Sequence, residues 1–165
     1  MKLSADLSYK SLTKLLNDIE TYRNQLKTKC DEFAKRLAEY GSSVAGQAFN
    51  MGGLGIIPPD VTMSVIKLDD GRYSIVANGT QVCFLEFGTG LYAGNPSDKY
   101  ATQMPFTVAP GSWSREHGNT WQDWLDQGKD PNAYPFNAYP VRGMLQAYNA
   151  MVDNAERIAR EVFGK

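Results

Sequence analysis

The sequence has no excess of charge of either sign, with 17 lysines and arginines against 18 aspartates and glutamates in 165 residues. Proteins that hold nucleic acid through its phosphates need a net positive charge or a strong basic cluster. The balanced composition therefore argues against specific nucleic-acid binding, and we expect none.

Long apolar runs are also missing. No window approaches the roughly 20 apolar residues of a membrane-spanning helix. Residues 1–16 have no apolar core of the kind found in secretory signals. We therefore expect a protein that is made in the cytosol and has no membrane partner.

Residues able to bind metals or to act as nucleophiles are scarce. His117 is the only histidine, so a metal site with Glu116 and Asp123, or a pairing with a nucleophile, would rest on one residue. Cys30 and Cys83 fall on apolar faces, which favours two small buried side chains over a disulfide or a metal pair. We expect His117 on the surface and no catalytic, metal-binding or cofactor-binding residues.

The most regular feature that is present is an apolar pattern with alternating spacings of four and three residues. Its members are Leu12, Leu16, Ile19, Arg23, Leu26, Cys30, Phe33, Leu37, Tyr40 and Val44. Arg23 is the only charged member. This period predicts one long amphipathic helix within residues 1–45, capped by Ser8 and ended by Gly41.

The predicted helix is long for so small a protein. From Tyr9 to Tyr40 it would measure about 48 Å at ~1.5 Å per residue, which exceeds the width of a domain of this size. Either the helix bends or breaks near Thr28, or part of it lies against another subunit. We expect the second arrangement.

Two strands are expected after a connection rich in glycine and proline over residues 41–59. Val61 to Val65 and Tyr73 to Ala77 each alternate apolar and polar side chains, which is typical of strands. Asp69-Asp70-Gly71 between them predicts a tight turn.

A third strand is expected next, because Asn78-Gly79 is a strong hairpin signal and an apolar run continues to Phe87. The result would be a three-stranded antiparallel meander over residues 60–88. Both faces of the last strand are apolar, so the face with Leu85 and Phe87 is expected to need cover from a neighbouring subunit.

Residues 89–139 show no sustained period and contain all the tryptophans, Trp113, Trp121 and Trp124. So long a loop is usually functional or partly folded. The tryptophans either stack on sugar rings or bases, or pack the loop onto the sheet or against another subunit, and packing or subunit contact is favoured. Residues 141–163 predict a second amphipathic helix, which completes a single α+β domain with two helices packed on an antiparallel sheet.

The stretch FLEFGTG, Phe84 to Gly90, has several interpretations. A phosphate-binding loop needs a helix N-terminus after the glycines, often with a lysine, and neither follows. Glu86 could act as a general acid or base, but hydrogen bonds to backbone N–H groups of the following loop, or an ion pair with Arg142, are favoured. Gly88 and Gly90 are best explained by a sharp turn with positive φ at the end of a strand.

The order of these features resembles a known family. FLEFGTG is followed by a Trp- and Pro-rich loop, and Tyr134-Pro135-Phe136-Asn137-Ala138 opens the last helix. The pattern is similar to the tail-completion proteins of long-tailed bacteriophages and prophages, also described as neck, head-tail joining, minor tail or minor capsid proteins. The likeness spans nearly the whole chain, although Pro140 is interposed before the helix. The residues that carry it are Glu86, Phe87, Gly88, Thr89, Gly90, Pro135 and Phe136.

The resemblance implies a structural virion protein and not an enzyme. Such subunits assemble in the bacterial host cytoplasm into a homo-oligomeric ring, expected to be a hexamer, at the head-proximal end of the tail. The implied partners are further copies of the chain, the tail tube or tail terminator protein, and the head-tail connector proteins. The alternative is a protein that binds or hydrolyses cell-wall glycan, with Glu86 as the acid and Trp113, Trp121 and Trp124 as a sugar platform.

Overall fold

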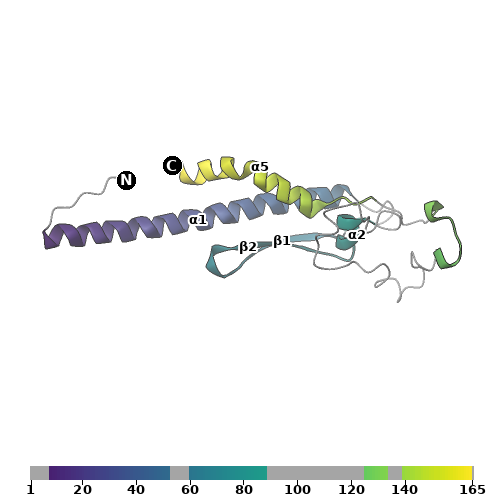
Figure 1. Cartoon of the computed structure of the whole chain (residues 1–165), viewed down its shortest axis with the longest axis horizontal. Helices are drawn as coiled ribbons and strands as arrows, with labels where there is room; N and C mark the ends of the chain where they lie inside the picture. Colours follow the sequence, from purple (N-terminus) through teal and green to yellow (C-terminus); the bar gives the residue numbers. More distant parts are fainter. Residues whose placement is uncertain (1–7, 53–59, 89–124, 134–138, 165) are drawn as a thin grey trace.

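The computed structural model describes residues 8–52, 60–88, 125–133 and 139–164. The elements in chain order are α1 (Tyr9–Met51), β1 (Thr62–Lys67), β2 (Tyr73–Asn78), α2 (Val82–Phe87) and α5 (Gly143–Phe163), with short 3-10 helices at Asp69–Gly71 and Pro131–Ala133. Figure 1 shows α5 on one side of the C-terminal half of α1 and the β-hairpin on the other. The long helix is therefore the middle layer, and its N-terminal half extends beyond both neighbours.

α1 begins where the sequence predicts. The Oγ of Ser8 accepts a hydrogen bond from the backbone N–H of Ser11 at 3.3 Å, which confirms Ser8 as the N-cap. The helix then runs without a break to Met51. The predicted stop at Gly41 is therefore wrong, and so is the irregular connection over residues 41–51; residues 53–59 of that predicted connection lie outside the described residues.

Gly41 is buried inside the helix, where α1 meets two other elements. A Cβ atom at this position would lie 2.6 Å from Sδ of Met151 in α5 and 2.9 Å from Cδ1 of Ile75 in β2. Glycine in a helix interior costs about 1 kcal/mol relative to alanine. Here it lets both neighbours approach the helix backbone, so its role is close packing rather than helix termination.

The hairpin of β1 and β2 follows the sequence prediction. The strands are antiparallel, with Val65 opposite Ile75 and Lys67 opposite Tyr73. The 3-10 turn Asp69–Gly71 joins them, and Gly71 has the positive φ of 72° that tight turns often require of glycine.

The predicted third strand is instead a helix. Val82–Phe87 form α2, so the sheet has two strands among the described residues and Asn78-Gly79 is not a hairpin turn. The Asp60 carboxylate accepts hydrogen bonds from the N–H and hydroxyl of Thr80 and from the N–H of Gln81. These bonds hold the turn that leads into α2. An apolar run as short as VCFLEF is compatible with a helix or a strand.

The core lies where the C-terminal end of α1 meets α2 and α5. Its buried side chains are Ala45, Phe49, Leu85 and Ala147. The ring of Phe49 rests on Gly143, where a Cβ atom would lie only 2.7 Å from a ring carbon. Further along α5, Ile158 and Val162 are buried. This packing confirms a mixed fold with a long N-terminal and a C-terminal helix.

The two cysteines differ from their prediction. Both Cys30 and Cys83 are exposed and free, so the expectation of buried thiols is wrong. Cys83 lies on the outer side of α2, because its segment is a helix with one buried side. Cys30 lies just before Phe33, whose ring meets that of Phe163 at the end of α5, with 6.2 Å between centroids. None of the helices among the described residues is long and apolar enough to cross a membrane.

Candidate functional site

The FLEFG segment forms a corner that fixes the start of α5. Glu86 is 3% exposed, and its carboxylate points at the first turn of that helix. Oε2 accepts a hydrogen bond from the N–H of Met144 at 2.9 Å, and Oε1 accepts one from the N–H of Leu145 at 3.2 Å. These N–H groups have no partner within the helix, and a carboxylate also suits the positive end of the helix dipole. Glu86 therefore caps α5 from a distant part of the chain.

Leu85 holds the segment that leads into α5. Its carbonyl oxygen accepts hydrogen bonds from the N–H of Val141 at 2.6 Å and the N–H of Arg142 at 3.2 Å. Arg142 has φ 58° and ψ 46°, a left-handed conformation that is uncommon outside glycine. The hydrogen bonds that the Leu85 carbonyl accepts help to hold this conformation, which directs the chain toward the start of α5.

Gly88 ends α2 with φ 80° and ψ 177°, and its N–H donates to the carbonyl of Phe84 at 2.8 Å. The positive φ is the property that the sequence predicts, although the glycine follows a helix and not a strand. The bonds that Glu86 accepts from Met144 and Leu145 of α5 were not among its predicted partners. Residues 89–124, which hold the loop expected to supply backbone N–H groups, lie outside the described residues.

Asp60 has the matching role at the other end of α2. Its bonds to the Thr80 hydroxyl at 2.7 Å and the Thr80 N–H at 2.9 Å tie the start of β1 to the end of β2. Hydrogen bonds from the Thr80 side chain, then from backbone N–H groups, lower the pKa of the Asp60 carboxyl from its ordinary value of 3.8. Gly79 permits this approach, because a Cβ there would lie 2.6 Å from the Asp60 carbonyl oxygen.

Several residues singled out in the sequence lie outside the described residues. They are Thr89, Gly90, Trp113, His117, Trp121, Trp124, Pro135 and Phe136. Leu85 and Phe87, expected at a subunit contact, are 1% and 9% exposed within the chain itself. The described part of the motif is therefore buried by contacts within its own chain.

A different surface is left open on α1. Figure 1 shows that the N-terminal half of α1 extends beyond α5. In this half, apolar side chains at helical spacing are exposed to solvent. We call this the free apolar face; it consists of Leu12, Leu16, Ile19, Tyr22 and Leu26, which are 41% to 67% exposed. The same row continues into Phe33 and Leu37, which are partly buried against the rest of the chain. Large contiguous apolar patches on a protein surface often mark interaction sites.

The charged residues beside this face lack partners among the described residues. Arg23 lies in the row itself, and Glu20 and Lys27 flank it. None of the three side chains makes an ion pair or hydrogen bond with the rest of the described chain. By contrast, Asp31 lies where α1 begins to pack against the rest of the chain, which we call the body. Its carboxylate accepts hydrogen bonds from Lys67 at 2.8 Å and from Tyr73 at 3.2 Å. The bond from Lys67 is the largest cause of the lowered pKa of Asp31.

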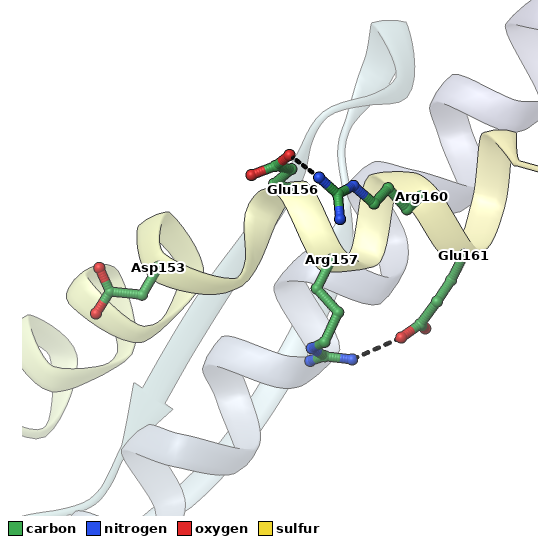
Figure 2. A pocket seen from close by; sticks show the side chains of 5 residues that line it. All are labelled: Asp153, Glu156, Arg157, Arg160 and Glu161. Carbon is green, nitrogen blue, oxygen red and sulfur yellow. Dashed lines mark hydrogen bonds and ion pairs between the residues drawn. The ribbon is translucent and has the colours of Figure 1, made fainter.

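The outer side of α5 carries a smaller apolar patch and a charged groove. Tyr148 and Val152 are 61% and 58% exposed. The groove is lined by Asp153, Glu156, Arg157, Arg160 and Glu161. Figure 2 shows ion pairs from Arg160 to Glu156 and from Arg157 to Glu161, with Asp153 pointing away from both. Exposed pairs of this kind contribute little to stability.

A second groove runs between α1 and β1. Its lining is mostly small and polar, from Ser42, Ser43, Gly46 and Gln47 on the helix and Thr62 and Met63 on the strand, and Glu39 is its single carboxylate. In the part of the chain that the structure describes, no cluster of three or more histidine, cysteine or acidic side chains is placed to hold a metal ion.

The comparisons with known proteins give no relative. No family model matches the sequence, and neither a curated protein nor a solved structure matches the chain.

Sequence reasoning missed Asp60 and the site that Glu86 caps. No local pattern links Asp60 to Thr80 or Glu86 to Met144, because each pair is joined only by the fold. The outer patch of α5 was detectable, since Leu145, Tyr148 and Val152 recur at helical spacing beside the buried row.

Proposed function

We propose that this protein is a structural subunit of a tailed-phage virion that completes the tail at its head-proximal end. Copies of the chain form a ring there, expected to be a hexamer, which contacts the tail tube or tail terminator on one side and head-tail connector proteins on the other. The resemblance of FLEFGTG, of the loop and of the PF segment to tail-completion proteins supports this proposal.

The observation that carries it is the free apolar face of α1. About half of α1 extends beyond the elements that pack against it and carries exposed leucines along one side. Such a surface is suited to binding a neighbouring protein. The corner built from Leu85, Glu86 and Gly88 supports the same role, because it sets the direction of α5 relative to α1.

In this proposal the protein is not an enzyme. Glu86 would have to act as the acid of a glycan hydrolase, yet both its oxygens accept backbone hydrogen bonds and the residue is 3% exposed. Such hydrolysis also requires a second carboxylate about 5 to 10 Å away. A glycan-degradation assay decides the alternative: turnover by the wild type that is lost in Glu86→Gln would contradict the structural role.

The main test is complementation of the parent phage or prophage lacking this gene. Leu16→Glu places a charge in the free apolar face, and since Leu16 is 67% exposed the fold should be kept. We expect few or no joined particles. The matched control is Asn17→Glu, which makes the same change on the adjacent, polar side and should give normal numbers.

A second pair of variants separates the turn at Gly88, which ends α2, from the loop. Gly88→Val forces a β-branched side chain into positive φ, so it should misdirect the chain after α2 and abolish joined particles. His117→Ala should leave their number nearly unchanged. The reverse pattern would move the function from the motif to the histidine.

A further inference from the structure

The free apolar face is self-complementary when two copies run in opposite directions. We infer that, before the protein binds a virion partner, the segment Leu12 to Cys30 of one chain pairs antiparallel with the same segment of a second copy. In this register Leu16 lies opposite the partner's Leu26, Ile19 opposite the partner's Arg23, and Leu12 opposite the partner's Cys30. The two-fold axis passes near Thr21.

The position of Arg23 determines the direction of pairing. In a parallel, in-register pair, Arg23 would face its own copy, and two unpaired guanidinium groups would meet in an apolar seam. In the antiparallel pair each Arg23 faces Ile19 and lies near Tyr22 of the partner, where its long stem packs and its guanidinium reaches water or the ring. The positive charge of Arg23 therefore disfavours the parallel arrangement.

The flanking residues fit the antiparallel arrangement on both sides of the seam. On one side, Glu20 of each chain comes beside the partner's Lys27, which forms two equivalent ion pairs. Neither side chain is engaged within the described part of its own chain. On the other side, Leu15 and Tyr22 widen the apolar contact. Charges at such flanking positions commonly set the orientation of paired helices.

The available length also fits. The free half of α1 begins at its N-cap Ser8 and ends where the body starts, at the Asp31 to Lys67 ion pair and the Phe33 to Phe163 contact. Antiparallel overlap of residues 12–30, about 27 Å at ~1.5 Å per residue, uses most of this half. Ser8 of each chain then lies level with Ala34 of its partner, so the start of each helix reaches the edge of the partner's packed part and the length of the free segment sets the register.

This pairing goes beyond the proposed ring. A two-fold contact makes both ends of the pair equivalent, whereas a ring between head and tail must present two different faces. The pair is thus the form of the free protein, which keeps the apolar face covered until a virion partner replaces the second copy.

Disulfide trapping tests the register. In a Cys83→Ser background, which leaves Cys30 as the only cysteine, oxidised glutathione should give little covalent dimer. Adding Leu12→Cys places a second thiol opposite the partner's Cys30, within the Cα distance of about 4.4 to 6.8 Å that a disulfide needs. We expect nearly complete conversion to a covalent dimer. Asn17→Cys in the same background, on the polar side of the helix, is the matched control.

Two results would overturn the inference. Efficient cross-linking through Cys30 alone would indicate parallel pairing. A Leu12→Cys variant that cross-links no better than the Asn17→Cys control, or a wild-type chain that stays monomeric at the highest attainable concentration, would show that the segment does not pair in this way.

Charge reversal gives an independent test in native protein. Glu20→Lys and Lys27→Glu each place like charges together, and each should weaken dimerisation by about tenfold or more at low salt. An equimolar mixture of the two variants restores both attractive pairs, so a heterodimer should form with near wild-type affinity. Lys14→Glu, on the polar side of the helix, should dimerise normally. Single variants that dimerise like the wild type, or a mixture without recovery, contradict the pairing.

The two proposals can fail separately. If trapping and charge reversal succeed but the wild-type gene does not complement tail joining, the antiparallel pairing is supported and the virion function is contradicted. If complementation succeeds while the chain neither pairs nor cross-links, the virion function is supported and the antiparallel pairing is contradicted.

Discussion

Asp60 and Glu86 show the same chemistry at the residue scale, because each carboxylate accepts backbone N–H groups at the start of a helix. Asp60 holds the entry to α2 through Thr80 and Gln81, and Glu86 holds the entry to α5 through Met144 and Leu145. Both join segments that are distant in sequence. They are therefore the side chains whose removal should most directly loosen the corner.

Glu86→Gln keeps the shape of the side chain but removes its charge and one acceptor oxygen. We expect the free energy of unfolding to fall by about 1 to 2 kcal/mol, the usual effect of losing a helix cap. Urea unfolding followed by circular dichroism measures it. Glu156→Gln, in an exposed ion pair, is the control and should change stability by less than about 0.5 kcal/mol. Equal effects of the two changes would argue against the capping role.

Asp60 predicts a pH dependence. Its pKa is lowered in the folded chain, so its ionised form stabilises the fold, and this contribution is complete above the unfolded value near 3.8. The contribution is lost as the pH falls below that value and through the folded pKa. The stability difference between wild type and Asp60→Asn should thus be constant from neutral pH to about pH 5 and shrink as the solution becomes more acidic. A difference that stays constant down to pH 2 would show that the carboxylate charge is not responsible.

At the scale of elements, the two long helices and the hairpin were predictable, whereas the C-terminal end of α1 and the helical conformation of Val82–Phe87 were not. Ser8 and the regular apolar row specify the start of α1, and Asp69-Asp70-Gly71 specifies the turn between the strands, because both signals are local. Gly41 was misleading, since a glycine that stops a helix and a glycine that lets neighbours approach look alike in sequence. VCFLEF was ambiguous because so short an apolar run fits a helix or a strand, and the bonds from Thr80 and Gln81 to Asp60 just before it join residues that no local pattern links.

Gly41 and Gly46 make a matched pair for testing the packing of α1. Gly41→Ala gains about 1 kcal/mol of helix propensity, but the new Cβ meets Met151 and Ile75 at 2.6 and 2.9 Å. We expect a net loss of about 1 to 3 kcal/mol through overpacking. Gly46→Ala meets only the flexible Met63 side chain at 3.2 Å, so its stability should be unchanged or higher. Thermal unfolding of both variants checks the difference, and a stabilised Gly41→Ala would contradict the close-packing role.

At the scale of the whole molecule, α1 has two halves with different support. The half from Phe33 onward packs against α5 and the hairpin, whereas the half before Cys30 has an exposed apolar face. Helices without tertiary packing are marginal in water. The stability of this single helix should therefore change along its length.

Hydrogen exchange of a monomeric variant measures that change. In Leu16→Glu, backbone amides of residues 12–26 should exchange at least about tenfold faster than those of residues 38–48, since the first group opens by local fraying and the second only with the core. In the wild type at high concentration, the first group should slow as copies pair. Uniform protection along α1 in the monomer would show that the free half does not depend on a partner.

α5 completes the core that α1 begins, although it is synthesised later. Phe49 of α1 has its packing partner at Gly143, and α5 is aligned only when Glu86 reaches Met144. Contacts between such distant positions form late and slow folding. While the ribosome is still translating the middle of the chain, the whole row from Leu12 to Val44 is therefore uncovered. The nascent protein should need protection from aggregation during synthesis, and a product truncated before residue 143 should accumulate only as insoluble material or as a chaperone-bound chain.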